Sequence, residues 1–403
     1  MRHITIVGGG QAGLVLAIGL RQRGYEVRLV QNRSAEEIAS GKVLSSQCVF
    51  AAARAEERAL GLDLWAADAP AIAGIRIQVA APDGSGAKVI GFEGRLTGPA
   101  NSVDQRIKFS RFIGVLGERG GRIELRDVGV AELEQYAASS DLVVVAAGKG
   151  EVSKLFARDP SRSPFDQPMR ALALVYVRGM QPYDGLLCVT ATLIPGVGEL
   201  FIIPALTQSG PCDILFFEAI PGGPLDCFDG LTDVAAQLAR IKEMVRRFIP
   251  WESDRIASST PTDANAWLVG RFAPTVRRGA GRLPSGRYVL GLADTIALAD
   301  PIVGQGANNA IKAARIYLDA IISRGSSPFD EAWMTATSEA AYRRVEASVQ
   351  WSNMMVLPPP EHAVMLLGKA MGNPALADRI ANGFDEPATI LPLFADPAQA
   401  AAA

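Results

Sequence analysis

Histidine is scarce in this chain of 403 residues, which holds two histidines, four cysteines and a formal net charge of −2. Because His3 and His362 stand far apart, a histidine-rich metal site or a Ser-His-Asp triad is not expected. The near-neutral charge provides no field to gather nucleic acid. The cysteines lack CxxC spacing and the density of a disulfide scaffold. Buried thiols in a reducing cytosol are therefore expected at Cys48, Cys188, Cys212 and Cys227.

Long uninterrupted hydrophobic runs are also missing, although 49% of the residues are hydrophobic and suffice for a sizeable core. The apolar stretch that ends at Leu20 resembles a secretory signal, but glycines interrupt it and no small-residue cleavage site follows. No later segment is apolar for long enough to span a bilayer. The expected protein is therefore cytoplasmic, with neither a membrane nor nucleic acid as a partner, and no metal site is predicted.

The order of apolar runs and turns predicts an α/β fold. A strand at 4–7, a glycine turn, a helix at 11–23 and a strand at 26–30 form a βαβ unit, and buried strands follow at 141–148 and 287–294. Between them, alternating segments at 72–92 and 189–219 predict mainly antiparallel sheet. We expect a discontinuous nucleotide-binding domain at 1–50, 95–165 and 280–325, a substrate-binding domain at 51–94 and 166–279, C-terminal helices at 326–386, and a flexible tail at 387–403.

The turn Gly8-Gly9-Gly10-Gln11-Ala12-Gly13 has the GxGxxG spacing directly after a strand and at the start of a helix. Glycines at this spacing permit a tight turn and close approach of a pyrophosphate, which the helix N-terminus then stabilises. The strand and helix around the motif favour dinucleotide binding over a structural turn without a ligand.

The end of the second strand departs from the usual dinucleotide pattern. The place of the acidic residue that holds the adenosine ribose is taken by Gln31, Asn32 and Arg33. Neutral amides still hydrogen-bond a ribose, and Arg33 suits adenine or a phosphate, whereas the alternative is an ordinary solvated loop. We therefore expect the dinucleotide to bind loosely.

The late strand indicates which dinucleotide binds. Gly291–Asp294, Asp300-Pro301 and Gly304–Asn309 resemble the second FAD fingerprint of glutathione-reductase-type flavoproteins. That resemblance implies that Asp294 binds the ribityl and pyrophosphate region and that the following helix directs its N-terminus at the flavin. A helix start would stabilise the negative charge of reduced flavin. The alternative is that Asp294 and Asp300 merely cap turns.

Two motifs of related flavoproteins are absent from the sequence. The segment 141–150 lacks the Asp-Gly motif of single-chain NADPH-dependent aromatic hydroxylases, and we find no second GxGxxG for NADPH. None of the five tryptophans fits the WxWxIP motif of flavin-dependent halogenases. The sequence therefore predicts an FAD enzyme without its own NADPH site.

Most of the chain resembles the two-component FAD-dependent styrene and indole monooxygenases. The resemblance rests on Ile6–Leu14, Ser163-Pro164-Phe165, Arg170-Ala171-Leu172, Pro195-Gly196, Gly198-Glu199-Leu200, Ile203-Pro204, Asp300-Pro301, Gly304–Asn308, Trp351 and Asn353. It implies an oxygenase component that receives reduced FAD from a separate NAD(P)H:flavin reductase. With O₂ the FAD would form a C4a-hydroperoxide, which passes one oxygen to a double bond conjugated to an aromatic ring.

Within that family, the segment near the flavin resembles the indole branch. Styrene enzymes have an Asn-x-Val-x-His pattern and indole enzymes a Ser-x-Gln-x-Met pattern. Ser45 and Gln47 match the indole pattern, and Val49 stands where methionine is expected. We hypothesise that Ser45 or Gln47 hydrogen-bonds the indole N–H or the flavin edge.

Three further positions agree with the indole branch. Ile72 and Ile75 occupy places that are tyrosine and histidine in styrene enzymes, and Ala100 replaces a serine. Each alone could be an ordinary packing position. Substrate contacts are thus expected from Val49, Ile72, Ile75 and Ala100, and catalytic roles from Ser45 and Gln47.

The resemblance also implies a set of cofactor contacts. Lys42 matches a basic residue near the flavin, although a solvated surface lysine is an alternative. The expected FAD-binding residues are Gly8, Gly10, Gln11, Ala12, Gly13, Gln31, Asn32, Arg33, Lys42, Leu44, Gly148, Asp294, Pro301, Gly304, Gln305, Gly306, Ala307 and Asn308.

The expected reaction is epoxidation of the C2–C3 bond of indole, leading to indoxyl and then indigo. Three alternatives remain open: a styrene epoxidase or sulfoxidase of the same family, a self-sufficient flavin oxidase or dehydrogenase, and a non-catalytic flavin-fold binding protein. The oligomeric state, a homodimer included, and the identity of the reductase are also open.

Overall fold

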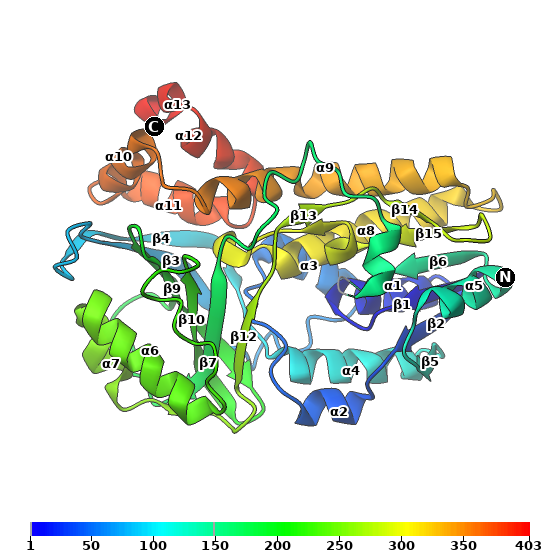
Figure 1. The fold of residues 1–403 in the computed structure, drawn as a ribbon, viewed down its shortest axis with the longest axis horizontal. Coiled ribbons are helices and arrows are strands. Elements are labelled where there is room, and N and C mark those ends of the chain that lie inside the picture. The colour runs from blue at the N-terminus through cyan, green and yellow to red at the C-terminus, as the bar shows by residue number, and fades with distance from the viewer. Residues whose placement is uncertain (1, 148–149) are drawn as a thin grey trace.

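Two large sheets organise the protein, as Figure 1 shows for a computed structural model that describes residues 2–147 and 150–403. The first sheet has the order β14-β15-β6-β1-β2-β5, and the five strands from β15 to β5 are parallel. Its strands are β1 (His3–Val7), β2 (Glu26–Gln31), β5 (Arg122–Leu125), β6 (Leu142–Val145), β14 (Ala280–Arg282) and β15 (Tyr288–Gly291). Strands β1, β2, β6 and β15 lie at the segments where the sequence predicts strands, with β6 and β15 shorter than the predicted ranges.

Helices cover both faces of the parallel sheet. One core packs Ile4 and Ile6 of β1 against α1 (Gln11–Gln22), α4 (Gln105–Glu118) and α8 (Gly306–Arg324). On the other face, Val7 and Val143 pack with α5 (Val130–Ser139) and the short turn η1 (Glu151–Leu155). This alternation is what a parallel sheet buried on both faces requires. The smaller helices α2 (Ala35–Ser40) and α3 (Ala51–Ala59) pack in the first of these cores, with α1, α4 and α8.

The second sheet is mainly antiparallel, with the order β11-β7-β10-β9-β8-β3-β4 and β12 also paired with β7. Its one parallel pair is β3 with β8. Its strands are β3 (Ile72–Ala80), β4 (Lys88–Ala100), β7 (Ala171–Arg178), β8 (Cys188–Ile194), β9 (Gly198–Thr207), β10 (Gly210–Ala219), β11 (Thr260–Pro261) and β12 (Trp267–Arg271). A separate small pair joins β13 (Thr275–Val276) to β16 (Ala297–Leu298). Because β4 extends to Ala100, both Arg95 and Ala100 pair with β3 of this antiparallel sheet.

Both faces of the antiparallel sheet are also covered. One face packs on α6 (Val234–Phe248), with η2 (Pro250–Glu252) and α7 (Ser253–Ala257) following it. The other face packs on helices α9 (Glu331–Met355), α10 (Glu361–Ala370) and α11 (Pro374–Gly383). A Cβ atom on Gly94 would lie 2.0 Å from the Ala377 carbonyl oxygen, so glycine lets α11 approach β4 closely.

The segment 387–403, expected from its alanine and proline content to be flexible, is folded in the structure. It forms η5 (Pro387–Thr389), α12 (Leu391–Ala395) and α13 (Pro397–Ala402). Leu393 and Phe394 are buried in the same core as Trp351. Proline lies in the first turn of each of these short helices, where its missing N–H has no cost. The composition therefore marked helix starts rather than disorder.

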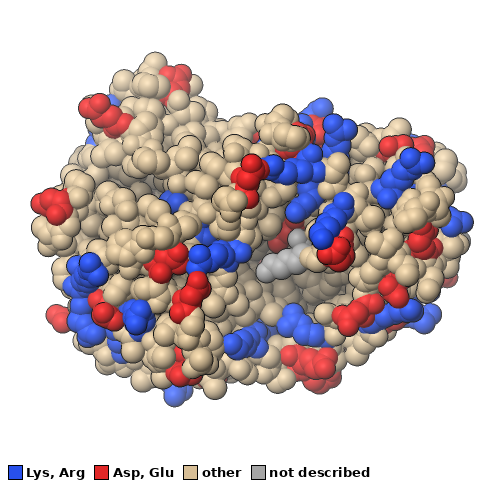
Figure 2. All heavy atoms as spheres, in the orientation of Figure 1, with Lys and Arg blue, Asp and Glu red and all other residues tan. Residues whose placement is uncertain are grey.

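The face of the molecule in Figure 2 carries acidic and basic side chains intermixed, with no large patch of one sign. Among the described residues, no helix is long and apolar enough to cross a bilayer. The fold is thus a parallel Rossmann-like sheet with helices on both faces, joined to an antiparallel-sheet unit and C-terminal helices. The predicted fold class is confirmed.

Candidate FAD and substrate site

The glycine turn between β1 and α1 leaves little room for any side chain. Gly8 has a φ of +116°, and a Cβ there would lie 2.7 Å from the Ala146 backbone. A Cβ on Gly13 would lie 2.0 Å from the Gly8 carbonyl oxygen. A Cβ on Gly10, by contrast, would meet nothing within 4 Å. Gly8 and Gly13 therefore close the turn, and Gly10 leaves open space beside the N-terminus of α1.

The first turn of α1 has free backbone donors beside that space. Gly10 provides no side-chain cap, so the N–H groups of the first turn have no capping acceptor. The Gln11 amide instead donates to Glu57 at 2.8 Å, and Lys108 pairs with Glu57 at 2.6 Å. Ala12 is buried in the core beneath the helix. The backbone of the turn, rather than these side chains, faces the open space.

Gln31 is the last residue of β2, where the ribose of a dinucleotide is expected. Its side chain is buried, yet neither amide atom has a hydrogen-bond partner among the described residues. The Gln31 Oε1 atom lies 1.7 Å from where a Cβ on Gly9 would stand, so the amide rests on the glycine turn. A buried amide without partners is costly unless a ligand completes its hydrogen bonds. Asn32 and Arg33 are exposed. The turn and Gln31 together fit a dinucleotide.

The second glycine segment places another open helix start. Asp300 caps the short turn η4 (Pro301–Val303), Gly304 adopts a left-handed conformation with φ of 63°, and α8 begins at Gly306. Cβ atoms on Gly304 and Gly306 would meet nothing within 4 Å. As at α1, the helix start has no side-chain cap and borders free space.

Gln305 and Asn308 hold this helix start in place. The Gln305 amide donates to Phe384 O at 2.7 Å. Asn308 donates to Cys48 O at 2.9 Å and accepts from Phe50 N at 2.9 Å, which ties α8 to the loop 42–50. Both side chains thus have protein partners, and their contact with FAD stays a prediction, as it does for Ala307 and Pro301.

Asp294 lies within the short turn η3 (Ala293–Thr295), which is separated from the end of β15 by one residue. Ala293 has a φ of 53° and is the one non-glycine residue with positive φ in the described part of the chain. Such strain persists only where the surroundings impose it, and it is typical of functional turns. Asp294 lines a small cavity beside α8 and α9. Gly148, also predicted to contact the cofactor, lies outside the described residues.

The loop 42–50 runs between the two sheets. Lys42 places its Nζ atom 3.5 Å from the centre of the Trp267 ring, a cation–π contact. Leu44 packs, partly buried, against the core of the first sheet. The Ser45 hydroxyl donates to Ser46 O at 3.0 Å, and its carbonyl accepts from the Tyr176 hydroxyl at 2.8 Å. The loop is therefore fixed to the antiparallel sheet on one side and to α8 on the other.

Gln47 leaves one buried acceptor free. Its Nε2 atom donates to the Val103 carbonyl, while its Oε1 atom is buried without a partner among the described residues. The residue is 5% exposed. Because the amide nitrogen is fixed by Val103, the oxygen can only be satisfied by a donor from a ligand or water.

The predicted substrate residues lie close to this loop but not in one core. Ile72 and Ala100 are directly opposite each other in the β3–β4 pair, and Ile75 lies on the same strand. These three are buried in the core beneath the C-terminal helices. Val49 pairs with Asn101 through its backbone, and its side chain packs in the core of the first sheet.

Sequence reasoning missed an acidic cluster at the end of the antiparallel sheet. Its members are all buried: Glu199 on β9, Glu218 on β10, Arg170 directly before β7 and Asp300 directly before η4. The signal was an acidic residue at the end of the otherwise apolar run Ile214–Phe217. It could not be interpreted without knowing the strand pairing.

Three of the four cysteine thiols are buried, and burial disfavours their ionised form. It raises the pKa of the Cys48 thiol to about 12 and of the Cys188 thiol to about 11. Cys212 is also buried, whereas Cys227 is partly exposed, and all four are free thiols. Burial was predicted for all four thiols, and it holds for Cys48, Cys188 and Cys212 but not for Cys227.

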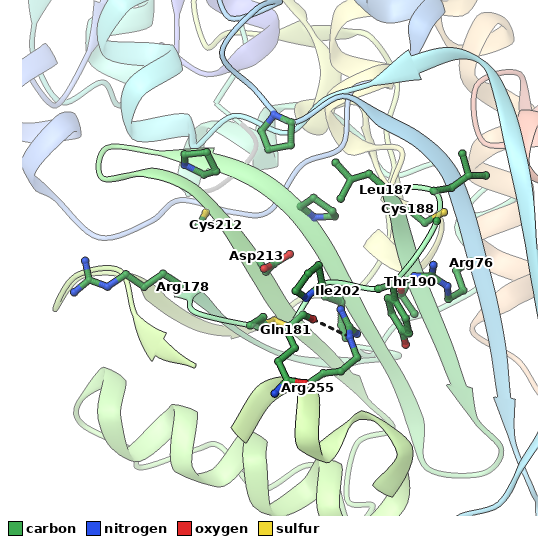
Figure 3. A pocket seen from close by; sticks show the side chains of 18 of the residues that line it. Arg76, Arg178, Gln181, Leu187, Cys188, Thr190, Ile202, Cys212, Asp213 and Arg255 are labelled. Atoms are coloured by element: carbon green, nitrogen blue, oxygen red, sulfur yellow. Dashed lines mark hydrogen bonds between the residues drawn. The ribbon is translucent and has the colours of Figure 1, made fainter. Parts of the chain in front are cut away.

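A cavity of about 350 Å³ opens on the side of the antiparallel sheet where α7 lies, as Figure 3 shows. Arg76, Thr190 and Asp213 line it from the strands, and Arg255 reaches in from α7. Burial raises the pKa of Asp213 to about 6. None of the predicted cofactor or substrate residues lines this cavity, so it is separate from the candidate site.

Comparison with solved structures defines the class of fold. The chain superposes on the flavin-dependent brominase Bmp2 with a TM-score of 0.67 and 16% identity, covering 99% of this chain and 98% of the other. It superposes on p-nitrophenol 4-monooxygenase PnpA from Pseudomonas putida DLL-E4 with a TM-score of 0.63 and 14% identity, covering 99% of both chains. The chain therefore has the fold that these enzymes share.

Sequence comparison is more specific. Residues 148–255 match the family described as "Styrene monooxygenase A putative substrate binding domain". Over 406 aligned residues the chain is 29% identical to styrene monooxygenase StyA of Pseudomonas fluorescens, covering 98% of this chain and 96% of the relative. The similarity thus extends from the glycine turn to the C-terminal helices.

Proposed function

We propose that this chain is an FAD-dependent monooxygenase, the oxygenase component of a two-component system. Similarity along the whole chain to styrene monooxygenase StyA supports the class of enzyme. The observation that carries the proposal is the glycine turn whose buried Gln31 amide lacks any partner among the described residues. A separate NAD(P)H:flavin reductase would supply reduced FAD, because the sequence has no second GxGxxG motif for NADPH.

Reduced FAD, when bound, supplies the two electrons by which one atom of O₂ enters the substrate and the other leaves as water. The protein's own part is to bind, orient and exclude water. The backbone N–H groups of Gly10 and Gln11 would hold the pyrophosphate, and Gln31 would hydrogen-bond the ribose. The open start of α8 would stabilise negative charge on the flavin.

For the substrate we propose indole, oxidised at its C2–C3 bond. The buried Oε1 atom of Gln47 is an acceptor that lacks a donor among the described residues. Indole has an N–H group that would satisfy it, and styrene has none. Ile72, Ile75 and Ala100 would form the apolar wall beside the ring. Ser45 is a weaker candidate, because its hydroxyl already donates to Ser46 O.

Epoxidation of styrene is the second candidate, favoured by the name of the relative that the chain resembles. The two substrates separate in one experiment. The purified protein receives chemically reduced FAD and air, with indole and styrene offered at equal concentration. We expect blue pigment and little styrene oxide. The reverse ratio would assign the chain to styrene, and no oxygenated product from either would refute the monooxygenase proposal.

A further inference from the structure

Glu218 is a fully buried acid at the end of β10. Its side chain is 0% exposed, and neither carboxyl oxygen accepts a hydrogen bond within the described structure. Its Cα partner on β9 is Glu199, so the two acids lie side by side on the sheet. Burying an ionised carboxylate without donors is strongly unfavourable.

The cation of this cluster is Arg170, and it already forms an ion pair with Glu199. The Arg170 guanidinium pairs with Glu199 through two hydrogen bonds of 2.8 and 3.0 Å. Its remaining terminal nitrogen donates to Met169 O and Val356 O at 2.9 and 3.0 Å. Arg170 thus balances Glu199, and no described residue forms an ion pair with Glu218 or Asp300.

One shared proton would remove the repulsion between the buried carboxyl groups of Glu218 and Asp300. Asp300 is 3% exposed, and its Oδ1 accepts the Ile302 N–H at 3.2 Å. Glu218 has no such donor, so Asp300 is the better place for the negative charge. Glu218 then carries the proton and donates it to Asp300. Like charges in contact inside a protein behave in this way.

The surrounding charges favour the same state. Burial raises the pKa of Glu218, and the neighbouring Asp300 and Glu199 raise it further against the opposing effect of Arg170. Burial also raises the pKa of Asp300, which its bond to Ile302 N–H and Arg170 partly offset. Because the two acids interact directly, they titrate as a pair.

We propose that Glu218 and Asp300 hold one shared proton and that this pair supplies it to the flavin end of the site. The inference deepens the proposed function and, for the transfer step, rests on it. Asp300 caps the turn Pro301–Val303, which leads through Gly304 into α8. The pair therefore stands at the end of the site where the flavin ring is expected.

The reaction needs such a proton. Anionic reduced FAD, O₂, the substrate and one proton give oxidised FAD, the epoxide and one water molecule. The open start of α8 favours the anionic form of reduced FAD, so the proton must come from elsewhere. A buried pair provides it without admitting solvent, and water returns the proton after the product has left.

Infrared difference spectroscopy of the protein without FAD tests the shared proton directly. At pH 7 we expect the carbonyl stretch of a protonated carboxylic acid, absent in Glu218→Gln and retained in Glu93→Gln. Glu93 is the matched control because it lies on the same sheet and pairs with Arg76. In Asp300→Asn the band should change frequency. A wild-type spectrum without the band, or an unshifted band in Asp300→Asn, would overturn the shared proton.

The transfer step has its own test. With reduced FAD, air and indole, we expect Glu218→Gln to form at least tenfold less product per FAD, with hydrogen peroxide rising in proportion. Product per FAD within twofold of the wild type would overturn the role in the reaction. A wild-type protein that shows the infrared band but no oxygenation would instead refute the proposed function and leave the proton pair standing.

Discussion

The glycine turn after β1 and the acidic cluster at the end of β10 are both polar features inside the protein, but they are built differently. In the turn, four glycines within six residues shape the backbone, and a side chain from the next strand completes the site. In the cluster, four side chains come from separate segments, namely Glu199 from β9, Glu218 from β10, and Arg170 and Asp300 from the residues just before β7 and η4. The turn depends on glycines, which have no side chain, whereas the cluster depends on side chains that strand pairing brings together. A substitution that fills the open side of the turn should therefore weaken ligand binding, whereas a substitution that unbalances the charges of the cluster should destabilise the folded state.

Breaking the ion pair of the acidic cluster should have the largest effect on stability. Arg170→Met leaves Glu199 ionised and buried beside two other acids, so we expect a loss of about 3–5 kcal/mol in the free energy of unfolding. Urea denaturation measures it. The double variant Arg170→Met/Glu199→Gln should recover part of the loss, because no uncompensated charge remains. An Arg170→Met protein as stable as the wild type would show that the pair is not the balanced unit described above.

In the glycine turn, two neighbouring substitutions should separate folding from binding. Gly13→Ala forces a methyl group onto the Gly8 carbonyl, and we expect a loss of about 3 kcal/mol in stability. Gly10→Ala meets no protein atom and should unfold like the wild type, but it should bind FAD about tenfold more weakly because its methyl group enters the open space. Thermal unfolding and flavin fluorescence titration read the two effects. Equal FAD affinity in Gly10→Ala would place the pyrophosphate elsewhere.

Asp213, in the cavity behind the antiparallel sheet, should show a smaller and pH-dependent effect. Its folded pKa of about 6 exceeds its ordinary value of 3.8. The unfolded chain therefore ionises first, and stability should fall as the pH rises from about 4 to about 6. Asp213→Asn removes this loss, so we expect it to be about 2 kcal/mol more stable than the wild type at pH 7 and equally stable at pH 3. Urea unfolding at both pH values checks this, and a parallel pH dependence in both proteins would contradict it.

The smallest expected effect concerns substrate choice. Gln47→Leu removes the free acceptor but keeps the apolar surroundings, so we expect kcat/KM for indole to fall about fivefold, equivalent to about 1 kcal/mol. Styrene turnover should change less than twofold. Ile75→Val, which keeps the wall apolar, serves as the control and should alter both substrates alike. Equal loss for indole and styrene in Gln47→Leu would remove the proposed hydrogen bond.

The comparison also explains what could be predicted from sequence. The glycine turn, its flanking strand and helix, and the second glycine segment before α8 are local patterns, so spacing alone located them. The antiparallel strands 189–219 were located by alternation and turn residues. The partners of those strands were not predictable, and without them Glu218 was only a polar residue at the end of an apolar run. The tail at 387–403 was misjudged because composition does not reveal that Leu393 and Phe394 reach the Trp351 core.

We propose that externally supplied reduced FAD is the reductant for oxygenation of an aromatic substrate by this chain. A single turnover with isotopically labelled O₂, reduced FAD and indole, without NADH or a reductase, tests it most directly. We expect one labelled oxygen atom in the indole product and the other in water. Product that carries oxygen from solvent, or no product while the FAD is reoxidised, would contradict it.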